Sequence, residues 1–174
     1  MASTARETGP VDRKAVDALR SRFNGALLRP EDEGFDVARR VWNGMVDRRP
    51  ALIARCTGVA DVQAAVRFGR EQDLLVSVKG GGHQVAGHAV ADGGLMIDLS
   101  LMRGAKVDPE ARTAKALGGS ILADVDRATQ VHGLATTLGV ISVTGIGASP
   151  WAGGSAISRA GMGSPWTTWS RSTW

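Results

Sequence analysis

The residue types best suited to chemistry are three consecutive glycines followed by a histidine, in the run KGGGH at 79–83. Apolar, strand-like runs lie before this run and after it, at 74–78 and 95–99. Backbone N–H groups without neighbouring side chains can surround a phosphate group. An imidazole beside them can act as a nucleophile. The pattern indicates a loop that meets a ligand closely, although tight turns alone would also require glycine.

A second glycine-bearing loop spans residues 139–147 and follows the apolar run 134–138. Neither loop carries a known nucleotide fingerprint. The Gly-Lys-Ser/Thr of a P-loop does not follow Gly82, and Pro150 stands where the Rossmann pattern needs a third glycine. Glycine count alone favours two tight turns. Because both fingerprints fail, a dinucleotide would have to bind by another fold.

The remaining candidate side chains favour structural roles. His132 precedes Gly133 at an expected helix end, where the helix dipole favours a cation. His88 lies in the first glycine loop, and its role stays open. The histidine spacing matches no zinc motif and no carboxylates cluster with it, so we expect no metal site. The single cysteine, Cys56, lies between an expected strand and helix, which favours burial.

Composition limits the class of protein. The 174 residues suffice for one domain with a sizeable core, and 43% of them are hydrophobic. The net charge of +4 comes from scattered basic residues, so we expect no nucleic-acid partner. No apolar run approaches the ~20 residues of a membrane span, and residues 1–23 lack a signal-peptide core. With one cysteine, these features favour a cytoplasmic protein.

An alternation of helices and strands must hold the two loops. Val16, Leu19 and Phe23 recur at helical spacing after Asp12 and predict an N-terminal helix. Residues 26–47 read as mostly loop. Beyond them we expect strands at 51–56, 74–78, 95–99, 105–107 and 113–117, and helices at 61–68 and 121–131 with Ser120 as cap. The first two strands and the helix between them form a β-α-β unit, and the fold class is α+β.

Several runs follow one another in the order and spacing of a known domain. They include RRPALI at 48–53, ADVQAAV at 60–66, VKGGGH at 78–83, DGGLMIDLS at 92–100 and TGIG at 144–147. Together they resemble the FAD-binding domain of the berberine-bridge-enzyme-like oxidases, in the vanillyl-alcohol-oxidase (PCMH-type) superfamily. The resemblance covers about residues 40–147. It implies a PCMH-type domain, with its N-terminal β-α-β subdomain and the start of the second subdomain.

This resemblance implies a cofactor and a role for each loop. The first loop would present amides to the FAD pyrophosphate, and His83 falls where the family bonds an imidazole nitrogen to the flavin 8α carbon. Ile141 stands where some members add a cysteinyl link, so attachment through histidine alone is implied. The implied cofactor-binding residues are Lys79, Gly80, Gly81, Gly82, His83, Gln84, Gly87, Leu138, Gly139, Ser142, Thr144, Gly145 and Ile146. No metal ligand is implied.

The resemblance also implies an activity. In the family, hydride passes from an alcohol, sugar or related small-molecule substrate to the flavin, and oxygen usually reoxidises the flavin. This chain would be the FAD-binding portion of such an oxidoreductase, and the residues that choose the substrate and supply the catalytic base would lie outside it. The alternative is a truncated, non-catalytic remnant (a pseudogene product) with little or no FAD binding.

Residues 148–174 differ abruptly from the rest of the chain. They contain four of the five tryptophans and no lysine, aspartate or glutamate. Codons chosen for 162–174, when read with a one-base shift, encode Gly-Leu-Thr-Val-Asp-Asn-Leu, which resembles the family at this place. We therefore expect a lead-in at 1–45, an incomplete FAD-binding domain at 46–147 and an out-of-frame tail at 148–174.

Overall fold

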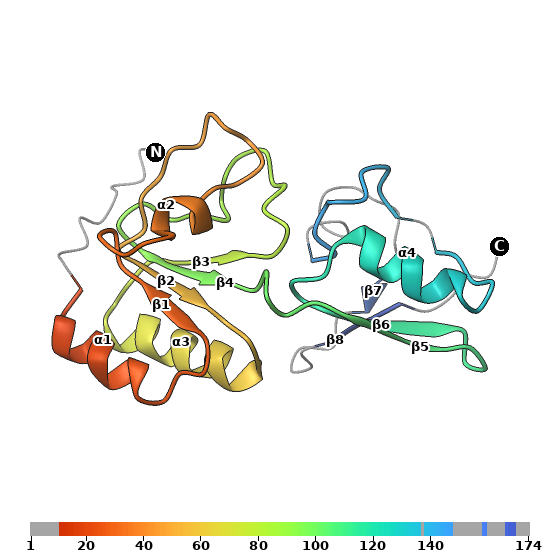
Figure 1. The fold of residues 1–174 in the computed structure, drawn as a ribbon, viewed down its shortest axis with the longest axis horizontal. Helices are drawn as coiled ribbons and strands as arrows, with labels where there is room; N and C mark the ends of the chain where they lie inside the picture. Colours follow the sequence, from red (N-terminus) through yellow and green to blue (C-terminus); the bar gives the residue numbers. More distant parts are fainter. Residues whose placement is uncertain (1–10, 137, 148–157, 160–165, 170–174) are drawn as a thin grey trace.

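Two sheets, each with its own helices, organise the part of the chain that the structure describes (Figure 1). The structure is a computed structural model, and it describes residues 11–136, 138–147, 158–159 and 166–169. The strand order is β1-β2-β4-β3 in the first sheet and β5-β6-β8-β7 in the second. Sheets and helices in these two units confirm the predicted α+β class.

The first unit is built on parallel strands. Both β2 and β3 run parallel to β4, whereas β1 runs antiparallel to β2. Because β4 is buried along its whole length, its sequence is continuously apolar up to Asp98. Helices α1 and α3 cover one face of the sheet and α2 lies on the other (Figure 1). The bounds are α1 Arg13–Arg20, β1 Ala26–Leu28, α2 Phe35–Ala38, β2 Leu52–Arg55, α3 Val59–Glu71, β3 Val76–Lys79 and β4 Leu95–Asp98.

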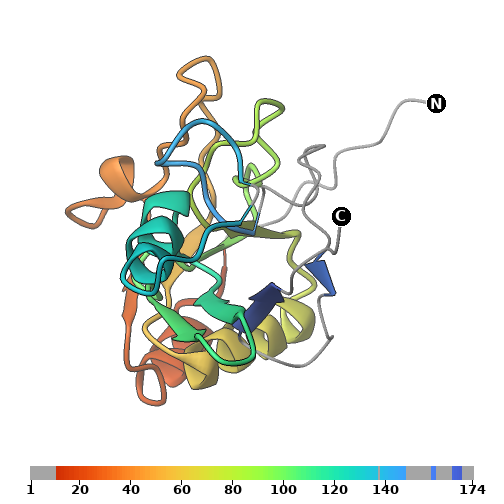
Figure 2. The same cartoon turned by 90° about the vertical axis from the view of Figure 1, so that its right-hand side faces the viewer.

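The second unit is an antiparallel sheet with one helix. Leu122 and Val125 of α4 are fully buried and pack with Ile146 and Ala116. Figure 2, which views the molecule from this end, shows α4 lying across β5 and β6. The bounds are β5 Ala105–Asp108, β6 Thr113–Leu117, α4 Leu122–Gln130, β7 Ser158–Arg159 and β8 Trp166–Trp169.

Two local expectations differ from the structure. Residues 26–28 were expected in a loop but form β1, because backbone pairing with β2 holds a segment too short to show a periodic pattern. Ser120 was expected to cap α4, but it is buried and its hydroxyl bonds Gly104. The carboxylate of Asp124 accepts the amide of Ile121 instead. Of the expected tail, only β7 and β8 are described, and its other residues lie outside the described ranges.

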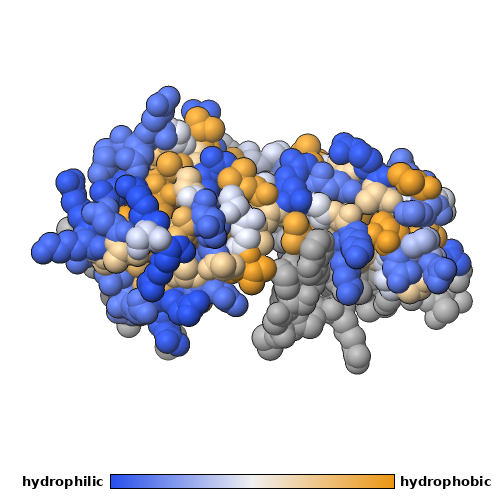
Figure 3. All heavy atoms as spheres, turned by 60° about the horizontal axis from the view of Figure 1, so that its bottom comes forward, coloured by the Kyte–Doolittle hydropathy of each residue, from blue (hydrophilic) through white to orange (hydrophobic). Residues whose placement is uncertain are grey.

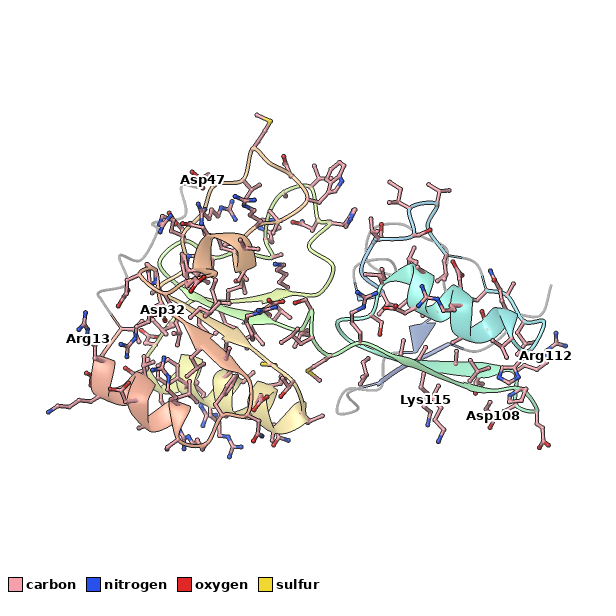
Figure 4. The ribbon with its side chains drawn as sticks, viewed as in Figure 1. Arg13, Asp32, Asp47, Asp108, Arg112 and Lys115 are labelled. Atoms are coloured by element: carbon pink, nitrogen blue, oxygen red, sulfur yellow. The ribbon has the colours of Figure 1, made fainter. Side chains whose placement is uncertain are left out.

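Polar residues dominate the outer surface of the first unit on the side of α1 and α3 (Figure 3). No helix among the described residues is both long and apolar enough to cross a membrane. The charged side chains of Asp108 and Arg112 lie at the end of the β5–β6 hairpin that is remote from the first sheet, and Lys115 projects from β6 between that end and the first sheet (Figure 4). This charged end is therefore distant from the loops that follow β3.

Candidate functional site

The carboxyl ends of the three parallel strands form one edge of the first sheet. Arg55, Asp98 and Lys79 end β2, β4 and β3 and stand side by side in the register of the sheet. The first glycine loop begins at this edge. In open sheets with parallel strands, ligands bind outside the carboxyl ends of the strands. The loop therefore starts where the topology favours a binding site.

A cavity of about 390 Å³ lies beside this loop. Its volume falls within the range of small-molecule sites, roughly 300–1,000 Å³. Five of the predicted site residues line it together, namely Gly80, Gly81, Gly82, His83 and Gln84. Six further lining residues were not assigned from the sequence, namely Val78, His88, Ala89, Leu99, Gly118 and Gly147. Three of them, Val78, Leu99 and Gly147, lie within runs that carry the family resemblance, and that position is the signal that could have found them.

The two glycine loops meet backbone to backbone. A Cβ on Gly81 would lie 2.4 Å from the amide nitrogen of Gly145, and a Cβ on Gly145 would lie 2.4 Å from the nitrogen of Gly81. A Cβ on Gly80 would lie 2.9 Å from the carbonyl oxygen of Gly118. Side chains cannot be accommodated at these positions without moving a loop. The glycines thus join the two units at the wall of the cavity.

Other residues of the second loop support α4 rather than the cavity. The carbonyl oxygens of Ser142 and Thr144 accept the amides of Ala123 and Leu122, each at 3.0 Å. These bonds satisfy donors that a helix N-terminus leaves unpaired. Six predicted site residues lie in this loop or directly before it without lining the cavity, namely Leu138, Gly139, Ser142, Thr144, Gly145 and Ile146. Instead, Gly147 brings the end of the loop to the cavity wall.

Lys79, also predicted to bind the cofactor, directs its ammonium group to α2. Its Nζ donates to the carbonyl oxygen of Ala38, the last residue of that helix, at 2.6 Å. Burial lowers the pKa of Lys79, while the nearby carboxylate of Asp98 opposes that change. Asp98 itself is 1% exposed, and Arg55 Nε lies 3.4 Å from its Oδ2. Lys79 fixes the start of the loop and is not among the lining residues.

His83 is half-buried at the cavity, and its ring stacks on the indole of Trp42. The ring centroids are 5.5 Å apart and the planes differ by 22°. Further along the loop, Gln84 Oε1 accepts the amide of His88 at 2.7 Å. Gly87 has a φ of +73°, and a Cβ there would lie 2.6 Å from Val46. Gln84 and Gly87 therefore also help to shape the loop.

This arrangement suits a flat, phosphate-bearing ligand. A backbone cradle without side chains allows close approach of a pyrophosphate, and a half-buried imidazole at its edge can form a bond to the ligand. Among the described residues, no group of three or more His, Cys, Asp or Glu side chains is placed to hold a metal ion. The backbone cradle and the half-buried imidazole therefore fit a dinucleotide.

Comparison with known proteins identifies such a ligand. A family model described as an FAD binding domain matches residues 50–166. (R)-6-hydroxynicotine oxidase of Paenarthrobacter nicotinovorans is 37% identical over 118 residues, which cover 68% of this chain and 26% of that protein. The crystal structure of 6-hydroxy-D-nicotine oxidase from Arthrobacter nicotinovorans matches with a TM-score of 0.68 at 36% identity, covering 71% of this chain and 27% of that one.

A structure of glucooligosaccharide oxidase from Acremonium strictum matches with a TM-score of 0.70 at 28% identity. The match covers 76% of this chain and 28% of that one, and that oxidase is described with a 6-S-cysteinyl, 8α-N1-histidyl FAD. This chain thus spans about a quarter of the length of the proteins it matches.

Proposed function

Since this chain belongs to the family of FAD binding domains, we propose that it serves as the cofactor-binding part of an FAD-linked oxidase. FAD is the cofactor of this family and its relatives are oxidoreductases, in agreement with the resemblance to PCMH-type, berberine-bridge-like oxidases. One observation carries the proposal. The glycine loop and His83 line a cavity at the carboxyl edge of the parallel strands.

We assign the FAD pyrophosphate to the backbone of the first glycine loop, at Gly80, Gly81 and Gly82. The contact between Gly81 and Gly145 supports this assignment, because it keeps the cradle free of side chains. His83 would form the covalent link to the flavin through an imidazole nitrogen. The only cysteine, Cys56, is buried, and burial raises the pKa of its thiol to about 12, which agrees with attachment through histidine alone.

The chemistry that bound FAD would supply is the acceptance of a hydride and the transfer of its electrons to oxygen. The residues of this chain would bind and orient the cofactor. For the whole protein, the substrate class that fits is a small molecule with an oxidisable carbon, such as an alcohol, a sugar or the hydroxynicotine named in two of the relatives. We also place the protein in the cytoplasm.

The proposal is tested by the flavin content of the purified 174-residue chain expressed with FAD. A functional FAD-binding domain should give yellow protein whose flavin remains with the acid-precipitated polypeptide, whereas the remnant described below should retain little or no flavin. His83→Ala should reduce this acid-stable flavin to background, because the nucleophile is lost. His132→Ala is the matched control, since this exposed histidine lies at the end of α4 and should keep the adduct. An adduct that survives in His83→Ala would disprove the assignment.

A second candidate is a non-catalytic remnant, which the composition of residues 148–174 favours. We propose that these residues are an out-of-frame translation, which predicts weak or no FAD retention by this chain. The nucleotide sequence of the locus tests the proposal. A continuation of the family pattern one base out of frame is expected, and its absence would contradict it. The flavin spectrum above separates the remnant from the functional domain.

A further inference from the structure

A segment without regular secondary structure, residues 39–48, lies along the first glycine loop and its continuation to Val90. The amide of Trp42 donates to the carbonyl of Gly82 at 2.9 Å. One residue on, Asn43 Nδ2 donates to the carbonyl of Val85 at 2.8 Å. At its end, Arg48 Nη1 donates to the carbonyls of Gly87 and Val90, at 3.0 and 3.2 Å. We call this segment the cover segment, because its contacts follow the loop in order.

Contacts within the cover segment hold its two ends together. Arg39 Nη1 donates to the carbonyl of Arg48 at 3.2 Å and also pairs with the carboxylate of Asp47. Asp47 lies on the same side of the first sheet as α2 (Figure 4). At the tip, the amides of Met45 and Val46 donate to the side chain and the carbonyl of Asn43. These contacts fix the segment independently of the glycine loop.

Trp42 is the residue through which the cover segment reaches His83. Its amide holds Gly82, and its indole stacks on the next residue of the loop, His83. Gly82 has a φ of +70°, a conformation that side chains rarely adopt, so the turn that aims His83 depends on glycine. Without the indole, the imidazole could rotate about its side-chain torsions among several staggered positions.

We infer that Trp42 is a positioning residue for His83, and that its indole fixes the plane of the imidazole at the cavity. This inference rests on the proposed function only for its consequence, the attachment of FAD. In that step the imidazole nitrogen would bond to the flavin 8α carbon in place of one hydrogen, and the imidazole N–H and the 8α C–H would each give up a proton. The electron pair would reduce the flavin, which oxygen would then reoxidise. A nucleophile held in one orientation reacts faster than one that samples several. Loss of the stack should therefore slow the formation of the covalent flavin by about tenfold, which is less than the roughly hundredfold cost of a 1 Å misplacement of a reacting group.

The test compares Trp42→Phe, Trp42→Leu and the control Met45→Ala in the full chain. Met45 belongs to the same segment and is 93% exposed, so its truncation should change nothing. The first readout is the NMR resonances of the His83 imidazole protons, without added FAD. An overlying indole shifts them upfield, and we expect Trp42→Leu to remove this shift and Trp42→Phe to keep part of it. Unchanged resonances in Trp42→Leu would overturn the inference.

The second readout is the rate at which acid-stable flavin forms. We expect about a tenfold decrease in Trp42→Leu, a rate within about twofold of wild type in Trp42→Phe, and no change in Met45→Ala. Equal rates in Trp42→Leu and Met45→Ala would also overturn the inference. Trp42 is 60% exposed, so its loss should leave the unfolding midpoint close to that of the control. If wild type forms no adduct, the proposed function fails, and the imidazole resonances alone decide the stacking.

Discussion

At the scale of single residues, the glycines of the first loop have different reasons to be glycine. Gly82 needs a positive φ, whereas Gly81 needs room for the backbone of Gly145 in the other unit. Sequence reasoning found both, because consecutive glycines mark close backbone approach. It could not say what approaches Gly81, since the neighbouring backbone belongs to a residue 64 positions along the chain.

Gly81→Ala tests this close approach. The new methyl group would lie 2.4 Å from the nitrogen of Gly145, so one loop must move. We expect the free energy of unfolding to fall by about 1–3 kcal/mol, as for other overpacked sites, and flavin retention to weaken. Gly44→Ala is the control, since a Cβ there meets nothing within 4 Å and should change stability by under ~0.5 kcal/mol. Equal denaturant midpoints for the two variants would contradict the argument.

At the scale of elements, α4 shows how a short helix is fixed beside the second loop. Asp124 accepts the amide of Ile121 at 2.9 Å and pairs with Arg103 at 2.7 Å. The hydrogen bond from Arg103 lowers the pKa of Asp124 below its usual value of 3.8, despite an opposing effect of burial. The predicted helix start, Ile121, lies one residue before the observed start at Leu122, and Ser120 was the wrong cap, because its hydroxyl is bonded to Gly104.

Asp124→Asn should lower the free energy of unfolding by about 1 kcal/mol near neutral pH, since it weakens both a helix cap and an ion pair. The pKa of Asp124 is lower in the folded chain than in the unfolded chain. Its ionisation therefore stabilises the fold above about pH 4, and this contribution is lost as pH falls through the folded value. Denaturation between pH 7 and 3 measures the effect. The difference in stability between wild type and Asp124→Asn should shrink as the pH falls. Asp126→Asn, on the same helix, is the control and should show no such change.

At the scale of the whole molecule, the cavity exists because two units meet. Gly80 to Gln84 come from the first unit, whereas Gly118 and Gly147 come from the second. The segments before α3 belong to the first unit, since β1 extends its sheet and the cover segment follows the glycine loop. Residues 1–45 were expected as an N-terminal helix and a lead-in, and Val16 and Leu19 of α1 pack into the core of the first unit. The periodic pattern of α1 indicated a buried face, but not the residues that this face contacts.

The sequence by itself determined the α+β class, most helices and strands, the glycine loop with His83, and the family. These features depend on neighbouring residues, whose periodicity and backbone freedom act over a few positions. Only the tertiary structure decided that Lys79 bonds Ala38, that Gly81 meets Gly145 and that Trp42 stacks on His83. Each of these contacts joins residues more than 40 positions apart. Sheet register and the meeting of the two units set such contacts, and local preferences do not.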